Sequence, residues 1–357
     1  MTETIVAPSD LAVRELAARD EPAVLSLLGA SLAGGPTGER TADFFRWKHA
    51  ANPFGRSPGL VAEADGRVVG LRVFLRWEFS AAGQTVPAVR AVDTATHPDF
   101  QGKGIFRRLT MALLDGLGSD PDGPQLVFNT PNGNSLPGYL KMGWQPVGNV
   151  PVAVRPVRLG RFLRGFRSAS AGRGQPAAGP VTCPLPAAAA VFTDAGARGS
   201  LAELVDEVVA ADDKEQRLHT RRSLDYLEWR YADAPGLDYR VLTVERAGRL
   251  AGVAFGRPRR RGALTELTLA EVIVRPGDRG SARRLLWAAT RAGCDHVATH
   301  LPAATDIGRA GRRAGYVDPP RTGLTLVTRP FPGYQSTLPD PRSLSSWRFS
   351  LGDLEVF

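Results

Sequence analysis

The most informative stretch of this 357-residue chain lies at residues 92–109 and reads VDTATHPDFQGKGIFRRL. Its β-branched residues before Pro98 favour an extended strand, and proline ends such a strand because it lacks a backbone N–H. Gly102 and Gly104 then allow a tight turn whose backbone N–H groups point into one concavity at the start of a helix. Unpaired N–H groups and the positive end of the helix dipole attract anions, so we expect a strand, a phosphate-binding glycine loop and a helix.

Two familiar phosphate-binding loops do not match this glycine pattern. The P-loop places four residues between its glycines, and the dinucleotide-binding loop needs a third glycine where Arg107 stands. The pattern that matches is Gln/Arg-x-x-Gly-x-Gly/Ala, with Phe106 in place of the small last residue. An apolar strand follows at residues 125–128, and residues 139–144, YLKMGW, then give Tyr-x-x-x-Gly-aromatic. With these two elements the chain resembles the GNAT superfamily, the Gcn5-related acyl-CoA transferases.

This resemblance implies an acyl-CoA site in the first half of the chain. Acetyl-CoA is the expected acyl donor, with its pantetheine arm along the strand before Pro98 and its pyrophosphate on the amides of the glycine loop. No metal is expected, because the histidines lack the spacing and the glutamate of a zinc helix motif. The predicted cofactor-binding residues are Thr94, Ala95, Thr96, Gln101, Gly102, Lys103, Gly104, Ile105, Phe106, Asn132 and Asn134.

Acyl transfer from a thioester to an amine needs an acid for the departing thiolate and a base for the amine. Tyr139 is the predicted acid, since a phenol with a pKa of about 10 can donate a proton; core packing of its ring is the alternative. Asp93, on the strand that enters the glycine loop, is the first candidate for the base, and a bond to a backbone N–H is its alternative role. Asp353 and Glu355 are the next candidates for the base. Resemblance to the enhanced-intracellular-survival aminoglycoside acetyltransferases adds the terminal carboxylate of Phe357.

An internal repeat organises the rest of the chain. Residues 40–53, RTADFFRWKHAANP, align without a gap on residues 222–235, RSLDYLEWRYADAP, at an offset of 182 (229 − 47). Further along, His97 aligns with Arg275 at an offset of 178 (275 − 97) because loops shorten. The second copy has no two-glycine loop, and Gly311 stands where the acid tyrosine would be. We therefore expect the second copy to have lost coenzyme A.

The repeat predicts an α/β fold of two tandem GNAT-like domains, each a mixed, mostly antiparallel sheet flanked by helices. This layout resembles that of the mycothiol synthases, the Fem-type aminoacyl transferases and the enhanced-intracellular-survival aminoglycoside acetyltransferases. The last are closest in kind, because their intact half is N-terminal. The predicted units are an acyl-CoA-binding domain at 1–157, a basic Gly/Pro/Ser-rich linker at 158–182, a degenerate GNAT-like domain at 183–330 and a Pro-rich C-terminal tail at 331–357.

Composition excludes several classes of partner. The formal net charge is +9, but only four of the 45 basic residues are lysines, so the charge reads as a compositional bias and nucleic acid is not expected. Two cysteines give no disulfide framework and favour a cytoplasmic location. No apolar run reaches the roughly 20 residues of a membrane span. Residues 159–167, LGRFLRGFR, alternate basic and apolar side chains; packing on the domain is the favoured role, and peripheral membrane contact is the alternative.

The sequence therefore predicts an acetyl-CoA-dependent N-acetyltransferase that acts by direct transfer on an amine of a small molecule or sugar. Two alternatives stay open. One is a Fem-like or polysaccharide and cell-wall acyl- or aminoacyltransferase. The other is a non-catalytic sensor that binds acyl-CoA.

Overall fold

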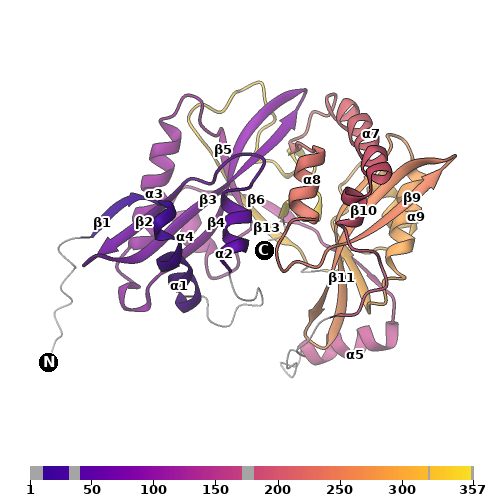
Figure 1. Ribbon diagram of the computed structural model, residues 1–357, viewed down its shortest axis with the longest axis horizontal. Coiled ribbons are helices and arrows are strands. Elements are labelled where there is room, and N and C mark those ends of the chain that lie inside the picture. Colours follow the sequence, from indigo (N-terminus) through magenta and orange to yellow (C-terminus); the bar gives the residue numbers. More distant parts are fainter. Residues whose placement is uncertain (1–10, 32–40, 171–180, 321, 355–357) are drawn as a thin grey trace.

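The computed structural model describes residues 11–31, 41–170, 181–320 and 322–354, which build two mixed sheets (Figure 1). The first sheet runs in the order β1 (Ala12–Glu15), β2 (Gly59–Ala64), β3 (Arg67–Ala81), β4 (Gln84–Thr96), β5 (Leu126–Asn129), β13 (Leu324–Pro330) and β6 (Gln145–Val150), and β8 (His219–Thr220) pairs with β3. The second runs in the order β7 (Ala153–Pro156), β12 (His296–Thr299), β11 (Leu264–Val274), β10 (Arg249–Arg261) and β9 (Arg240–Arg246).

Helices cover both faces of each sheet. On the first sheet, α1 (Glu21–Ser31) and α2 (Ala42–His49) pack on one face, and α3 (Ile105–Gly118) and α4 (Leu136–Lys141) pack on the other. On the second sheet, α6 (Ala190–Thr193), α7 (Ala195–Asp212) and α8 (Leu224–Tyr231) face α9 (Arg279–Ala289) and α10 (Asp306–Arg313) across the strands. The remaining elements are α5 (Leu159–Ser170), α11 (Leu351–Leu354) and the 3-10 turns η1 (Ala18–Asp20), η2 (Pro98–Phe100) and η3 (Leu344–Ser346). The predicted α/β class, with two mixed sheets flanked by helices, is confirmed.

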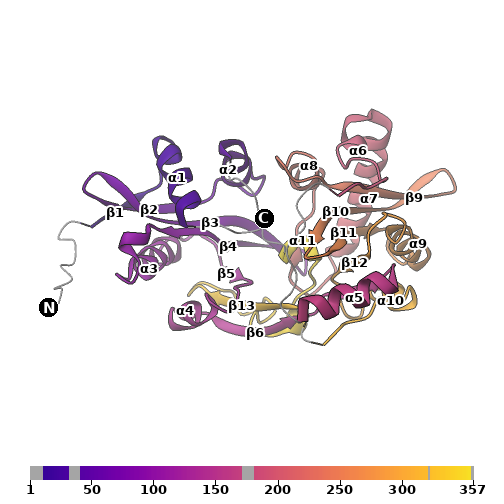
Figure 2. The ribbon, with the colours of Figure 1, turned by 90° about the horizontal axis from the view of Figure 1, so that it is seen from below.

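The two halves exchange one strand each. β13 lies at the end of the second half in sequence, yet it lies between β5 and β6 of the first sheet and is antiparallel to both. β7 lies at the end of the first half, yet it pairs with β12 of the second sheet, with His296 opposite Pro156. Figure 2 shows β13 beside β6 under the first half. Each sheet is therefore completed by chain from the other half, and the predicted linker holds the helix α5.

The repeat brings its two equivalent tryptophans together between the halves. The indole N–H of Trp47 donates to the backbone carbonyl of Trp229 at 2.7 Å, and the indole N–H of Trp229 donates to the carbonyl of Trp47 at 2.9 Å. Their rings stack with centroids 5.0 Å apart. Around them a single core joins Phe128 of β5 with Phe255 of β10. This reciprocal contact is an approximate two-fold relation, as an aligned repeat would produce.

The first sheet opens where the glycine loop begins. β4 and β5 pair in parallel only from Ala88 opposite Leu126 to Arg90 opposite Phe128, whereas β4 continues to Thr96. The register between β3 and β4 also shifts after Arg72, which gives β4 one extra residue. Such a bulge turns the following side chains to the opposite face of the strand. The splayed strands leave a slot that ends at the loop.

Candidate active site

The glycine loop of the first half has the geometry of an anion site. It lies between β4, which ends at Thr96, and α3, which begins at Ile105. Gly102 and Gly104 adopt φ values of 76° and 74°, which favour glycine, and a Cβ at either position would meet no atom within 4 Å. No described side chain caps α3 at Gly104, so the first N–H groups of the helix face open space. An anion can bind there without displacing any protein group.

A cavity of about 460 Å³ joins this loop to Tyr139. Its walls come from the end of β4, the glycine loop with the first turn of α3, the start of α4 and Ser31 of α1. The predicted site residues that line it are Thr94, Ala95, Thr96, Gln101, Gly102, Gly104, Ile105, Phe106, Asn134 and Tyr139. The cavity is thus a slot with the open amides and the phenol on its walls.

Lys103 and Asn132 lie outside the lining of this cavity. The Lys103 ammonium stands over the Phe100 ring, 4.7 Å from its centroid. The Asn132 side chain instead shapes the turn before α4, because its Oδ1 accepts hydrogen bonds from the backbone N–H groups of Asn134 and Ser135 at 3.1 Å and 3.0 Å. Asn132 therefore positions the chain that carries Asn134 into the slot.

Tyr139 has a positively charged partner that sequence reasoning missed. The Arg72 guanidinium donates to the Tyr139 hydroxyl at 3.1 Å and to the carbonyl of Val92 at 3.2 Å. Its central carbon lies 4.7 Å and 5.4 Å from the ring centroids of Phe74 and Phe106. Arg72 is fully buried, and no described carboxylate lies within ion-pair distance of it. A buried cation without a counter-charge is costly, so its position beside the phenol suits an anion that forms during a reaction.

Asp93 faces α2 rather than the slot. Its Oδ2 lies 2.8 Å from the Lys48 ammonium and 2.8 Å from Nε2 of His49, and all three side chains are buried. The bulge in β4 explains this direction, because Ala91 packs in the core under α3 while Asp93 turns toward α2. The sequence placed Lys48 and His49 in the repeat next to Trp47 but gave no sign of their contact with Asp93.

The C-terminal segment reaches the same sheet. Arg90 of β4 is 2 % exposed, and its guanidinium donates to the carbonyls of Asp353 at 2.6 Å and Leu354 at 2.7 Å. Thr130, just after β5, also accepts a hydrogen bond from Arg90 at 3.0 Å. Phe357, the third predicted catalytic residue, lies outside the described residues. The chain that leads to it is therefore anchored to β4 in the first half.

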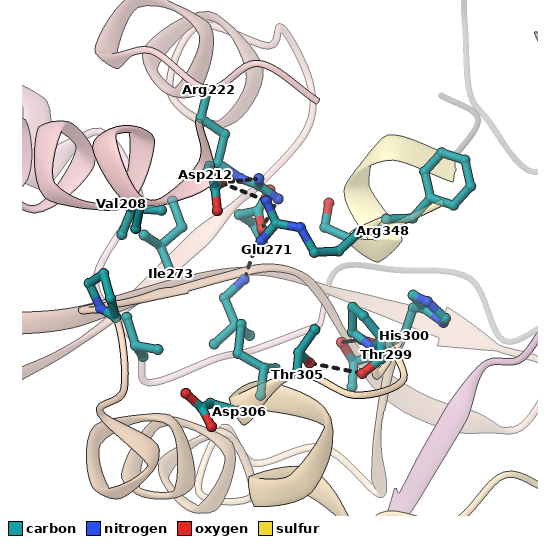
Figure 3. A pocket seen from close by; sticks show the side chains of 18 of the residues that line it. Val208, Asp212, Arg222, Glu271, Ile273, Thr299, His300, Thr305, Asp306 and Arg348 are labelled. Atoms are coloured by element: carbon teal, nitrogen blue, oxygen red, sulfur yellow. Dashed lines mark hydrogen bonds and ion pairs between the residues drawn. The ribbon is translucent and has the colours of Figure 1, made fainter. Parts of the chain in front are cut away.

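The second half keeps a smaller pocket at the equivalent place, with a volume of about 160 Å³ (Figure 3). At the offset of 178, Glu271 takes the position of Asp93 (271 − 93). Arg222 binds both carboxylate oxygens of Glu271 at 3.2 Å and 3.3 Å, and Arg348 of the C-terminal segment lies 2.6 Å from Asp212. Burial raises the pKa of Glu271. Ion pairs thus fill the inner end of this pocket.

The anion site of the second half is closed by its own side chain. Asp278 caps α9, where its carboxylate accepts from the Ser281 N–H at 2.9 Å and from the Ser281 hydroxyl at 2.7 Å. This carboxylate lies where Gly104 of the first half leaves the helix start open. A pyrophosphate would meet a negative charge there, which supports the loss of coenzyme A expected from the sequence.

Within the described ranges, no group of three or more His, Cys, Asp or Glu side chains could hold a metal ion. None of the helices in the part of the chain that the structure covers is long and apolar enough to cross a membrane.

Comparison with known proteins agrees with the geometry. Residues 12–147 match the family model of the acetyltransferase (GNAT) domain. No curated protein matches the chain. Among solved structures, a probable N-acyltransferase of unknown function from Enterococcus faecalis V583 is 11 % identical with a TM-score of 0.62, and it is matched over 90 % of this chain and 73 % of its own.

Two further solved structures are GCN5-related N-acetyltransferases. The one from Kribbella flavida is 14 % identical, with a TM-score of 0.57, over 90 % of this chain and 71 % of its own. The one from Anabaena variabilis ATCC 29413 is 12 % identical, with a TM-score of 0.60, over 90 % of this chain and 73 % of its own. At such identities the likeness shows the fold alone. The family match shows more: residues 12–147 are an acetyltransferase domain of the GNAT superfamily, and the chain is an acyltransferase.

Proposed function

We propose that this acyltransferase is an acetyl-CoA-dependent N-acetyltransferase that transfers the acetyl group directly to an amine of a small molecule or sugar. The observation that carries the proposal is the single slot lined by both the open glycine loop and Tyr139. A donor with phosphates at one end and a thioester at the other needs such a slot. The uncapped start of α3 fits the phosphates, and the phenol fits the sulfur.

In this mechanism acetyl-CoA supplies the activated thioester. The amine nitrogen forms a C–N bond with the carbonyl carbon, the C–S bond breaks, and Tyr139 donates its proton to the departing sulfur. Arg72, 3.1 Å from the Tyr139 hydroxyl, stabilises the negative charge that develops beside it. Phe106 and Phe74 keep water from the guanidinium and so strengthen this electrostatic effect.

For the proton of the attacking amine we propose Asp93 acting with His49 through a water relay, because Asp93 faces α2 and neither side chain lines the slot. An imidazole 2.8 Å from a carboxylate is a common arrangement for a general base, and Lys48 balances the charge of the carboxylate. Both cysteines, Cys183 and Cys294, are buried in the second half, which supports direct transfer rather than a cysteine acyl-enzyme. The same free thiols support a cytoplasmic location.

Calorimetric titration with acetyl-CoA tests the donor. We expect one-site binding by the natural protein and at least about tenfold weaker binding by a Gly102→Glu/Gly104→Glu variant, because two carboxylates would repel the pyrophosphate. Gly248→Glu is the matched control, since Gly248 has a φ of 73° and equally open surroundings in the second half. Absence of binding by the natural protein would contradict the proposal and favour the Fem-like alternative.

Thiol release with a panel of primary amines tests the chemistry. We expect release that depends on the amine and that falls steeply in Tyr139→Phe while acetyl-CoA binding is retained. Tight acetyl-CoA binding without turnover on any amine, unchanged by Tyr139→Phe, would instead identify a sensor.

A further inference from the structure

Helix α5 presents an apolar strip to solvent on the second half. Leu159 is 64 % exposed and Leu163, one helical turn later, is 53 % exposed. Leu159 is the most exposed large apolar side chain in the described part of the chain. Two leucines on one helix face, each more than half exposed, mark a contact surface rather than isolated exposed residues.

The opposite side of α5 is fixed to the second half, so the strip cannot simply turn inward. The Phe162 ring lies 5.3 Å from the His296 ring, centroid to centroid, and the Gly165 backbone lies close to the Leu264 side chain. Arg158 and Arg161 lie 3.6 Å and 3.4 Å from the buried Asp295 carboxylate. These contacts hold the helix with its leucines outward.

The segment around α5 is strongly basic. The described part of this segment, residues 157–165, contains no Asp or Glu and three arginines, at positions 158, 161 and 164, of which Arg158 and Arg161 share the single Asp295 carboxylate. The hairpin next to α5 carries Arg259, Arg260 and Arg261 just before Leu264, against which α5 packs. Arg259 and Arg261 share the single Glu266 carboxylate, so this hairpin keeps a net positive charge. Figure 1 shows α5 at the edge of the second half, away from α3 and the glycine loop. A partner of this surface must therefore be anionic and must also accept apolar side chains.

We propose that α5 docks the protein on bilayers that contain anionic lipids. Arginines bind lipid phosphates, while leucines on the same helix enter the boundary between head groups and acyl chains. Nucleic acid would satisfy the arginines but would leave Leu159 and Leu163 in water. A bilayer satisfies both, and docking through the second half leaves the slot of the first half open.

Sedimentation of the full-length protein with vesicles tests this surface. We expect binding to phosphatidylcholine vesicles that contain phosphatidylglycerol, much weaker binding to pure phosphatidylcholine, and a loss of binding as salt rises. Leu159→Ser/Leu163→Ser should weaken binding by about tenfold or more, since burial of each leucine contributes about one tenfold step or more. Leu140→Ser is the control, because Leu140 is 41 % exposed on α4 of the first half.

Two outcomes would overturn the proposal. One is the absence of binding to anionic vesicles at low salt by the natural protein. The other is equal binding by the natural protein and the double leucine variant, once thermal melting shows that both are folded. Salt-sensitive binding to RNA that both forms share, without vesicle binding, would assign the basic surface to nucleic acid.

Discussion

Replacement of Arg72 by methionine separates catalysis from stability. Arg72 makes a charged hydrogen bond to the Tyr139 hydroxyl at 3.1 Å. Such a bond contributes about 1.5–3 kcal/mol, and each 1.4 kcal/mol changes a rate about tenfold. If the guanidinium stabilises the negative charge that develops on the Tyr139 oxygen, Arg72→Met should therefore lower kcat by about 10- to 150-fold.

The free energy of unfolding of Arg72→Met should change little or increase, although kcat falls. Methionine has a similar length and lacks the charge, and the Arg72 Nε has no hydrogen-bond partner in the described structure. The variant loses two hydrogen bonds, to Tyr139 and to the carbonyl of Val92, but no longer buries a cation that has no carboxylate partner among the described residues. Because burying one ion costs several kcal/mol, we expect the free energy of unfolding to stay the same or to rise.

Steady-state thiol release and urea unfolding, made on the same preparations, measure both quantities. Arg76→Met is the matched control, since Arg76 lies on the same strand and its guanidinium donates to the carbonyl of Arg56 at 3.2 Å, away from Tyr139. A kcat for Arg72→Met within about twofold of the natural value would refute the catalytic role. So would a loss of kcat that is explained by a comparable loss of folded protein.

Three other predictions concern the base, the pH response and the contact between the halves. Asp93→Asn and His49→Gln should each lower kcat/KM by about 10²- to 10⁴-fold and flatten the acidic limb of its pH profile; a limb unchanged in both variants would exclude them as the base. Burial, with help from Arg348, lowers the pKa of His219 to about 4. Because the unfolded histidine binds a proton below about 6.5 and the folded one does not, this residue should lower the free energy of unfolding by about 2 kcal/mol between pH ~7 and pH ~5. A His219→Gln variant should lack that decrease in urea unfolding. Trp229→Phe removes a buried hydrogen bond and should cost about 1–3 kcal/mol, whereas Trp287→Phe, on an exposed face of α9, should change stability by less than about 0.5 kcal/mol; equal effects of the two in urea unfolding would contradict the role of the tryptophan pair.

Local chemistry explains which parts of the fold were predictable. Proline and glycine act on their own neighbours, so the strand, loop and helix around Gly102 could be read without any tertiary information. The exchange of β7 and β13 between the sheets could not be predicted in this way. A short strand such as Leu324–Pro330 has the same apolar pattern in either sheet, and only the closure of the whole core decides which edge it joins.

The residues of the site were likewise predictable only where they are close together in sequence. The residues on the glycine loop are neighbours in sequence, and a motif can report them together. Arg72 meets Tyr139 across 67 residues of chain, and Lys48 meets Asp93 across 45. The one available signal was an arginine inside the apolar run of β3, and Arg76 on the same strand gives the same signal without contacting Tyr139. The bulge that turns Asp93 toward α2 depends on the pairing of β3 with β4, which no single stretch encodes.

The strand exchange explains how one half could lose its cofactor site and still be required. Asp278 closes the helix start in the second half with a single carboxylate, a change that leaves the core beneath it intact. Yet the end of that half supplies β13, whose Val327 packs in the same core as Tyr139 and Trp144. The tail after it supplies the segment that Arg90 anchors to β4. The first sheet thus needs chain from the end of the second half, and a failure of the second half to fold would displace β13 and with it the wall behind the phenol.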